Sequence, residues 1–328
     1  VLNSTFIRAN STAGGFIYIE GARADVLDST FMFSSSNIIK NGIGDGNGGA
    51  IYIAGDDAVV SGDFRFINAT GGEGIPGHGG AIYVAGNNAN ITDSTFFGTH
   101  ARNDGFGGAI YVTGNNTYMN NDTFDNGFAY KAGAVYISGN NAVINMSDFV
   151  SNNCMDDGGA VYITGENVKV INSNFTSNIA GDDGGAIYWE GNGGLMENIT
   201  CFDNHAISST GSSNGGKICI IGSNINLNAS TFEQTHALIA GGAIFITGNY
   251  VNITDSSFKN CFVSMDIEDT GKEYANGGGS IYVFGNYTNL LNCTFEDTHA
   301  REGGAIYIQG NEVTIDELNS TSTYAKAG

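Results

Sequence analysis

Residues 159–165 read Gly-Ala-Val-Tyr-Ile-Thr-Gly, and close copies of this phrase recur along the whole chain of 328 residues. Apolar residues take alternate positions in it, at Val161 and Ile163, and again just downstream at Val168 and Val170. A spacing of two places side chains on one face of a short strand, and no apolar spacing of three to four accompanies it. The sequence therefore predicts an all-β chain made of one short unit copied many times.

A glycine precedes the apolar stretch in every copy and marks the period. The intervals between markers run from 24 to 37 residues, with a floor near 25, which indicates a fixed coil with loop insertions. The longer intervals arise in the turn before Gly-Gly, at residues 34–47, 69–78, 99–106, 206–214 and 264–275. The markers are Gly15, Gly49, Gly80, Gly108, Gly133, Gly159, Gly185, Gly216, Gly242, Gly279, Gly304 and Gly328.

One copy is too short to bury its own apolar faces, but stacked copies can bury them by pairing as parallel strands about 4.8 Å apart. We therefore expect a right-handed parallel β-helix of about 11–12 coils, with three short strands in each coil. The repeat runs unbroken, so residues 1–328 are predicted to form a single β-helix domain. The chain begins and ends inside a repeat, and we expect it to be a fragment of a longer chain.

Corresponding positions keep their chemistry from coil to coil, which predicts rows of like side chains. The inward aliphatic row is Ile17, Ile51, Ile82, Ile110, Val135, Val161, Ile187, Ile218, Ile244, Ile281 and Ile306. An aromatic row is Phe6, Phe31, Phe96, Phe124, Phe149, Phe175, Phe232, Phe258 and Phe295, with Cys201 replacing Phe once and the alignment open between Phe64 and Phe66. A small row, Ser4, Ser29, Ser94, Ser147, Ser173, Ser230 and Ser256, is expected to hydrogen-bond along the stack. Asn87, Asn115, Asn140, Asn192, Asn249, Asn286 and Asn311 are expected in turns with positive φ.

Charge and composition limit the partners. Thirty-three acidic residues against twelve basic ones give a net charge of −21, so nucleic acid is excluded as a partner because phosphate binding needs Lys and Arg. Five cysteines at irregular spacing are expected to be packing residues, with one or two disulfides as the alternative. Fourteen Asn-x-Ser/Thr sequons favour an extracellular, glycosylated chain at the cell surface. The candidate glycosylation sites include Asn90, Asn121, Asn145, Asn174, Asn228, Asn252 and Asn292.

The pairing of Gly-Gly-Ala-Ile with a downstream Phe-x-x-Asn resembles the repeats of chlamydial-type polymorphic outer-membrane proteins. The first motif begins at Gly49, Gly80, Gly108, Gly159, Gly185, Gly242 and Gly304. The second is strict only at Phe149 and Phe175, and Thr replaces its Asn after Phe96, Phe232 and Phe295. The Asn-rich, acidic, lysine-poor background is similar to that of the adhesin-like surface proteins of methanogenic archaea. The resemblance covers essentially the whole chain and implies a cell-surface adhesin.

Two polar groups are candidate metal sites. Asp156, Asp157, Asp182 and Asp183 take equivalent positions in adjacent coils, where four carboxylates repel one another unless a cation such as Ca²⁺ lies among them. The alternative is that they are four solvated turn residues. His100, His205, His236 and His299 share a position four residues after the aromatic row, which makes a two-histidine metal site or a simple polar row. Calcium is the only cofactor that the sequence suggests.

An outward row of tyrosines is the candidate binding surface. Its side chains point away from the aliphatic row, and small or polar residues neighbour them, so we predict an exposed aromatic stripe for glycans, proteins or a second copy of the chain. The alternative is that the stacked rings only protect the sheet. The central residues of this row, called the Tyr stripe below, are Tyr52, Tyr83, Tyr111, Tyr136, Tyr162 and Tyr188.

Three functions fit these features. The first is a non-enzymatic adhesin or structural rod that attaches cells to cells, hosts or glycans. The second is a self-assembling extracellular filament or sheath subunit, because open coil ends and the Tyr stripe could pair between copies. The third is a polysaccharide lyase or hydrolase of the β-helix class. Such enzymes need clustered carboxylates beside Lys or Arg, and these cations are scattered along the sequence, so we predict that the chain is not an enzyme.

Overall fold

The structure is a computed structural model that describes residues 1–36, 46–69, 76–207, 213–263 and 277–325. Parts of the predicted insertions, including residues 264–275, lie outside these ranges. Throughout the described ranges the regular elements are β-strands, and none of them contains a helix that could span a membrane. The chain forms two compact units, residues 1–155 with 160–169 and residues 156–159 with 170–328, and the single-domain organisation stays a prediction.

Unit 1 contains a first row of strands, one in each coil, formed by the Ile-Tyr-Ile phrases. These are β3 (Ile17–Ile19), β6 (Ile51–Ile53), β9 (Ile82–Val84), β13 (Ile110–Val112), β17 (Val135–Ile137) and β21 (Val161–Ile163). The rest of each coil adds β1 (Thr5–Ile7), β2 (Asn10–Ser11), β4 (Asp25–Met32), β5 (Ser35–Ser36), β7 (Val59–Arg65), β8 (Asn68–Ala69), β10 (Asn90–Thr92), β11 (Thr95–Phe97), β12 (His100–Ala101), β14 (Tyr118–Asn120), β15 (Thr123–Asp125), β16 (Phe128–Ala129), β18 (Val143–Asn145), β19 (Asp148–Val150) and β20 (Asn153–Cys154).

Unit 2 repeats the same plan, and β22 (Lys169–Ile171) crosses from one unit to the other in sequence. Its first row is β25 (Ile187–Trp189), β29 (Ile218–Ile220), β32 (Ile244–Ile246), β35 (Ile281–Val283) and β39 (Ile306–Ile308). The other strands are β23 (Asn174–Thr176), β24 (Ile179–Ala180), β26 (Gly194–Glu197), β27 (Thr200–Phe202), β28 (His205–Ala206), β30 (Ile225–Asn228), β31 (Thr231–Ala237), β33 (Asn252–Thr254), β34 (Ser257–Val263), β36 (Asn289–Leu291), β37 (Thr294–Glu296), β38 (His299–Ala300), β40 (Thr314–Asp316), β41 (Asn319–Thr321) and β42 (Tyr324–Ala325).

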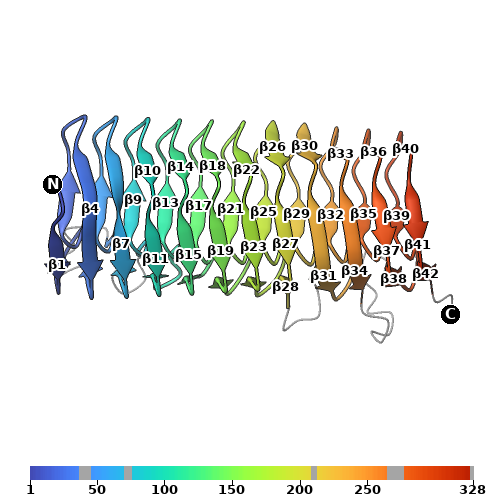
Figure 1. The fold of residues 1–328 in the computed structure, drawn as a ribbon, viewed down its shortest axis with the longest axis horizontal. Helices are drawn as coiled ribbons and strands as arrows, with labels where there is room; N and C mark the ends of the chain where they lie inside the picture. Colours follow the sequence, from blue (N-terminus) through green and yellow to red (C-terminus); the bar gives the residue numbers. More distant parts are fainter. Residues whose placement is uncertain (37–45, 70–75, 208–212, 264–276, 326–328) are drawn as a thin grey trace. The chain divides into compact units, whose positions relative to one another are not determined.

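Strands of successive coils pair in parallel and in register within each unit (Figure 1). In unit 1, Ile110 of β13 lies between Ile82 of β9 and Val135 of β17. In unit 2, Ile244 of β32 lies between Ile218 and Ile281 in the same way. Parallel pairing from coil to coil, with every strand contributed by the next copy of the repeat, is the topology of a right-handed parallel β-helix. The predicted all-β, right-handed parallel β-helix is confirmed. Most of the described coils have four strands and not the predicted three, because a two-residue strand such as β12 follows the strand of the aromatic row.

The predicted core rows are buried in both units. The aliphatic row has no exposed surface from Ile51 onward until the last coil. The phenylalanine row stacks with centroid separations of 4.7 to 4.9 Å from Phe31 through Phe64, Phe96 and Phe124 to Phe149. Phe64 is therefore the member of the aromatic row that the sequence left open, and Phe66 instead stacks on the exposed ring of Phe33.

The serine row forms the hydrogen-bonded ladder that the sequence predicts. The hydroxyl of Ser94 accepts a hydrogen bond from the backbone N–H of Gly62 and donates to the carbonyl of Thr92. Ser256 accepts from the backbone N–H of Ser230 in the neighbouring coil. Each hydroxyl thus satisfies one buried backbone donor of the adjacent coil, which is why a small hydroxyl residue recurs there.

The asparagine row requires a correction, because positive φ falls one residue later than predicted. Asn88 and Asn116 have φ values of 56° and 58°, whereas Asn87 and Asn115 do not appear among the positive-φ residues of the described chain. The side-chain oxygen of Asn87 instead accepts from the backbone N–H of Asn115 in the next coil, at 3.0 Å. Asn at this position therefore accepts a hydrogen bond from the backbone of the next coil, and its own backbone does not adopt a positive φ.

Candidate functional site

A row of aromatic and imidazole rings lies on the outward face of unit 2 and is called the ring row here. Consecutive coils pair His205 with His236, His236 with Phe262, Phe262 with His299, and His299 with Tyr324. The four rings from His236 to Tyr324 stack with centroid separations of 4.6, 5.0 and 4.9 Å. Parallel planes in contact are about 3.5 Å apart, so rings 5.0 Å apart are offset by roughly 3.5 Å and leave part of each face uncovered.

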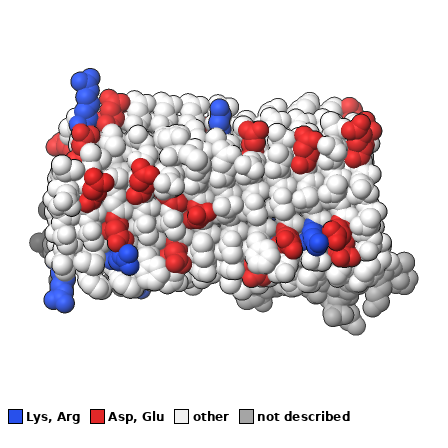
Figure 2. Space-filling view, in the orientation of Figure 1, with Lys and Arg blue, Asp and Glu red and all other residues white. Residues whose placement is uncertain are grey.

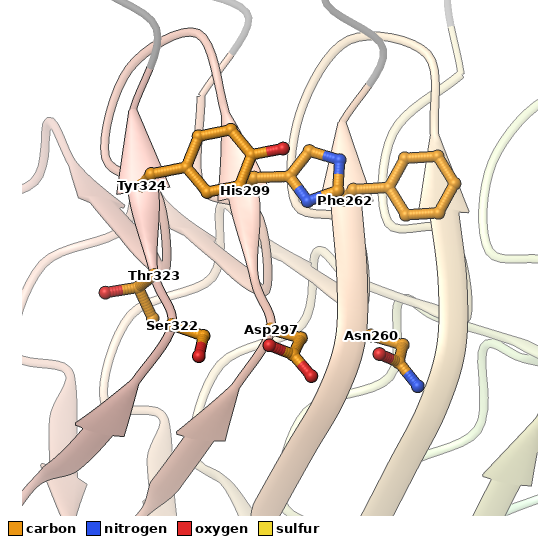
Figure 3. Close-up of a pocket in the computed structure, with 7 residues that line it drawn as sticks. All are labelled: Asn260, Phe262, Asp297, His299, Ser322, Thr323 and Tyr324. Carbon is orange, nitrogen blue, oxygen red and sulfur yellow. The ribbon is translucent and has the colours of Figure 1, made fainter.

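The end of the ring row lines an open pocket of about 600 Å³. Phe262, His299 and Tyr324 form one row of it, and Asn260, Asp297 and Ser322 form a second row alongside (Figure 3). These three polar residues have positive φ values of 51°, 52° and 54°. Asp297 and Ser322 lie between strands, Asn260 lies within β34, and Thr323 completes the lining. Half-exposed rings beside a row of hydrogen-bonding groups are the arrangement that a polar ligand with flat apolar faces requires.

Electrostatics at the pocket favour a neutral imidazole. Desolvation by burial lowers the pKa of His299, so the ring is uncharged at pH 7 and offers one donor and one acceptor. Lys259 pairs with Glu296 of the next coil at 3.2 Å, one residue before Asp297. On the face shown in Figure 2, acidic side chains are spread widely and outnumber the basic ones.

The prediction from the sequence covers only part of the ring row. It grouped the histidines but missed Phe262 and Tyr324, which take the same position in their coils. Aligning the coils by position, without regard to residue type, places Phe262 and Tyr324 in the same row as the histidines and would have identified them. His205 and His236 do lie on adjacent coils, and the two-histidine metal site stays a prediction.

The Tyr stripe stacks as expected but is less exposed than predicted. In unit 1 the rings from Tyr52 to Tyr162 stack at centroid separations of 4.8 to 5.2 Å. Tyr136 and Tyr162, however, are only 9% and 4% exposed, and Tyr52, Tyr83 and Tyr111 are half-buried.

Residues of the turn before Gly-Gly explain this burial. His78 stacks on Tyr111 at 4.7 Å, Phe106 stacks on Tyr136 at 5.0 Å, and the Lys131 ammonium lies 4.5 Å from the centre of the Tyr162 ring. In unit 2, Tyr188 packs against a buried cluster that contains Cys219, Ile239, Phe245 and Tyr282. The turns fold back over the sheet, so most of the row is a second apolar core and the binding role of its six tyrosines stays a prediction.

The structure brings together the predicted acidic cluster of unit 2. Carboxylate oxygens of Asp156, Asp157 and Asp182 lie within 4.8 Å of one another. Asp183 accepts a 2.7 Å hydrogen bond from the backbone N–H of Asn214, and its backbone N–H donates to Asp157. Burial, and then the charges of Asp182 and Asp157, raise the pKa of Asp183 to about 7. The oxygen donors suit Ca²⁺, and calcium binding stays a prediction.

The predicted sequons lie on the surface turns and strands. At Asn121, Asn145, Asn228, Asn252 and Asn292 the side-chain nitrogen donates a hydrogen bond to an oxygen of the preceding coil. Glycosylation would place its sugar on that nitrogen, within the ladder. The five cysteines are all buried, and no disulfide joins them in the described residues.

Asp122 interrupts the serine ladder and is the buried acid that sequence analysis missed. It is 1% exposed; its Oδ1 accepts from the backbone N–H of Ser94 at 2.9 Å, whereas its Oδ2 is buried without a hydrogen-bond partner. Burial, with a smaller contribution from the charge of Asp93, raises the pKa of Asp122 to about 8. The carboxyl group is therefore held as the neutral acid at pH 7.

We expect Asp122→Ser, which restores the residue of neighbouring coils, to stabilise the protein at pH 8.5 but not at pH 4. Because the folded pKa is raised, the native state holds a proton that the unfolded chain releases, and stability falls as pH rises from about 4 to about 8. At about 1.4 kcal/mol for each pKa unit, the gain at pH 8.5 should be roughly 2 to 4 kcal/mol. Urea unfolding at both pH values measures it. An equal effect at the two pH values would contradict the assignment.

Comparison with known proteins gives a structural similarity at low sequence identity. No protein-family model matches the chain, and no curated protein matches it. Among solved structures, the chain is similar to the A-module of the Azotobacter vinelandii mannuronan C-5 epimerase AlgE6, at 10% identity and a TM-score of 0.36 over 94% of this chain and 91% of that one. The resemblance to outer-membrane and archaeal surface proteins therefore rests on sequence motifs alone.

The prediction that the chain is not an enzyme is contradicted by this finding, because the similar structure belongs to an epimerase. The prediction rested on Lys and Arg being scattered along the sequence. Folding brings distant residues of successive coils together: the Lys259–Glu296 pair lies beside Asp297, two residues before His299. Sequence scatter is thus a poor measure of clustering in a β-helix, since neighbours across the coils are about 25 residues apart in the chain.

Proposed function

We propose that this chain binds polysaccharide along the ring row of unit 2. The observation that supports it is the pocket in which Phe262, His299 and Tyr324 lie in a row beside Asn260 and Asp297. Sugar rings have C–H faces that pack on aromatic rings and hydroxyl edges that hydrogen-bond to amides and carboxylates. The pocket offers both kinds of contact, in two parallel rows that repeat from coil to coil.

The repeat of the coils favours a polymer as the ligand. Ring centroids recur every 4.6 to 5.0 Å along the row, and a linear glycan that runs in the same direction presents similar groups again at each residue. With a net charge of −21, the protein repels acidic polymers, so we infer a neutral or amine-bearing polysaccharide. The motif resemblance implies an extracellular protein at the cell surface. Of the roles that it implies, our proposal keeps attachment to glycans.

A binding panel tests the proposal. The protein is titrated with β-glucan, mannan, chitin, chitosan, alginate and pectin oligomers, and we expect neutral or amine-bearing oligomers to bind. Tyr324→Ala should weaken that binding about five- to twelvefold, because one lost ring contact is worth about 1 to 1.5 kcal/mol. Phe33→Ala is the matched control, since Phe33 is an exposed stacked ring on unit 1 and should leave the affinity unchanged.

The same assay reports on turnover. Incubated oligomers are analysed for new reducing or unsaturated ends and for epimerised residues, which would show that the pocket also acts on its ligand. Failure of every oligomer to bind, or an equal loss in the Phe33 and Tyr324 variants, would overturn the proposal.

A further inference from the structure

A second pocket of unit 2 lies at the end of a short tyrosine stack. Tyr250 and Tyr287 occupy the turn between the first two strands of their coils, and their rings stack at 4.6 Å with planes 3° apart. They are 51% and 40% exposed. The pocket beside them has a volume of about 490 Å³, and we call it the Tyr287 pocket. It is lined by Tyr250, Asn252, Tyr287, Asn289, Glu312, Val313 and Thr314.

The backbone at these tyrosines is strained, and apart from their mutual stacking both rings remain about half-exposed. Tyr250 and Tyr287 both have a φ of 57°, in the left-handed region where Asn is tolerated best and a bulky side chain is unfavourable. Other coils place Asn at this turn position: Asn88, Asn116, Asn141, Asn167 and Asn224. Since about half of each ring stays exposed, this stack stabilises the fold less than a buried pair would, and a ligand contact explains why tyrosine is tolerated at a strained position.

Glu312 ends the stack and leaves one ring face open. It takes the same turn position in the next coil, with a φ of 53°. The face of Tyr287 that turns toward this coil therefore meets the pocket and not another ring. The carboxylate of Glu312, followed by the neighbouring Tyr250, raises the pKa of Tyr287, which places the negative charge next to that ring.

A chain of amide hydrogen bonds forms one side of the pocket. The side-chain N–H of Asn289 donates to the amide oxygen of Asn252 at 2.7 Å, and Asn252 donates onward to Asn226 at 2.8 Å, which leaves the amide oxygen of Asn289 as the acceptor at the end of this chain. The lining contains one carboxylate and no Lys or Arg. A ring face next to a carboxylate attracts an ammonium group, by the cation–π and charge contributions together.

We propose that the Tyr287 pocket binds the protonated amino group of an amino-sugar residue in a polysaccharide. The ammonium lies over the open face of Tyr287 and donates to Glu312, while the sugar hydroxyls donate to the oxygen of Asn289. That the amine is carried by a sugar rests on the proposed function. A lysine side chain of another protein has the same ammonium chemistry, and the experiment separates the two sources.

The test compares glucosamine oligomers with N-acetylglucosamine oligomers of equal length by calorimetry at pH 6, where the amine is protonated. We expect the unacetylated oligomers to bind at least tenfold more tightly. Glu312→Gln should abolish this preference while leaving the affinity for the acetylated oligomers unchanged. Tyr287→Asn should lower the affinity for the unacetylated oligomers and leave the fold intact, because it restores the residue of other coils. Glu166→Gln, an exposed glutamate in a unit 1 turn, is the control and should change neither affinity.

Each outcome decides the inference separately from the proposed function. Equal affinity for the two oligomers, or a preference that survives Glu312→Gln, overturns the amine site even if Tyr324→Ala confirms glycan binding. Glu312-dependent binding of poly-lysine without binding of glucosamine oligomers overturns the assignment to a sugar. If Tyr324→Ala leaves all binding intact while Glu312→Gln removes the amine preference, the proposed ring-row function fails and the amine site stands.

Discussion

Replacing Ile244 with aspartate is expected to destabilise unit 2 by about 4 kcal/mol or more, enough to unfold many domains. Ile244 has no exposed surface and pairs with Ile218 on one side and Ile281 on the other. A carboxylate at this position would lose its hydration among aliphatic side chains and find no partner. Urea unfolding followed by circular dichroism measures the loss.

The matched control places the same residue on the outward face. Thr231 is exposed on β31, between Thr200 and Ser257 of the adjacent coils, with no acidic residue directly opposite. Thr231→Asp should therefore change stability by less than about 1 kcal/mol. If the two variants lose similar stability, the assignment of inward and outward faces is wrong.

The second large effect concerns a buried lysine in unit 2. Lys217 has no exposed surface, and it stands where most coils have alanine, as at Ala50, Ala81, Ala109, Ala134, Ala160, Ala186 and Ala243. Its ammonium donates to the backbone carbonyls of Cys201 and Glu233. Cys201 in turn replaces phenylalanine between Phe175 and Phe232 of the aromatic row. The long Lys217 side chain, at a position that is usually alanine, thus accompanies the small Cys201 side chain, at a position that is usually phenylalanine.

Burial in this core alters both titrations. It lowers the pKa of Lys217 to about 8 and raises the pKa of the Cys201 thiol to about 12, with the nearby Lys217 charge opposing the second shift. Because the folded lysine binds its proton less tightly than the unfolded one, the group destabilises the fold below about pH 8, and this penalty disappears as pH rises toward 10.5.

We expect Cys201→Phe alone to cost about 3 kcal/mol, because the new ring competes with the Lys217 side chain for one space and displaces its ammonium from two carbonyl oxygens. Adding Lys217→Ala should recover most of this loss, since the pair then matches the other coils. A double-mutant cycle by urea unfolding at pH 7 measures a coupling energy of about 2 to 3 kcal/mol. Additive effects of the two changes would show that the residues fill separate spaces.

Much of the candidate site followed from position in the repeat, and the parts that were missed have two causes. His205 and His236 are predicted to lie on adjacent coils, and Asp156, Asp157 and Asp182 to lie close together, and the structure places each group together. Phe262 and Tyr324 were missed because the ring row was defined by residue type. The exposure of the Tyr stripe was overestimated because the turns that cover it lie outside the regular repeat, where no periodic pattern predicts their path.

The sequence by itself determined the fold, its parallel register and its core. Alternation of apolar residues in each Ile-Tyr-Ile phrase fixes which face is buried, and identical phrases can satisfy one another only by stacking in register. Only the tertiary structure decided what the surface presents. Three such features are the covering of Tyr162, the open ring face of Tyr287 and the packing of Lys217 beside Cys201. Each depends on side chains about 25 or more residues away in sequence, in coils where the repeat is broken. Departures from a repeat are local in space but distant in the chain, and so their partners are found only after folding.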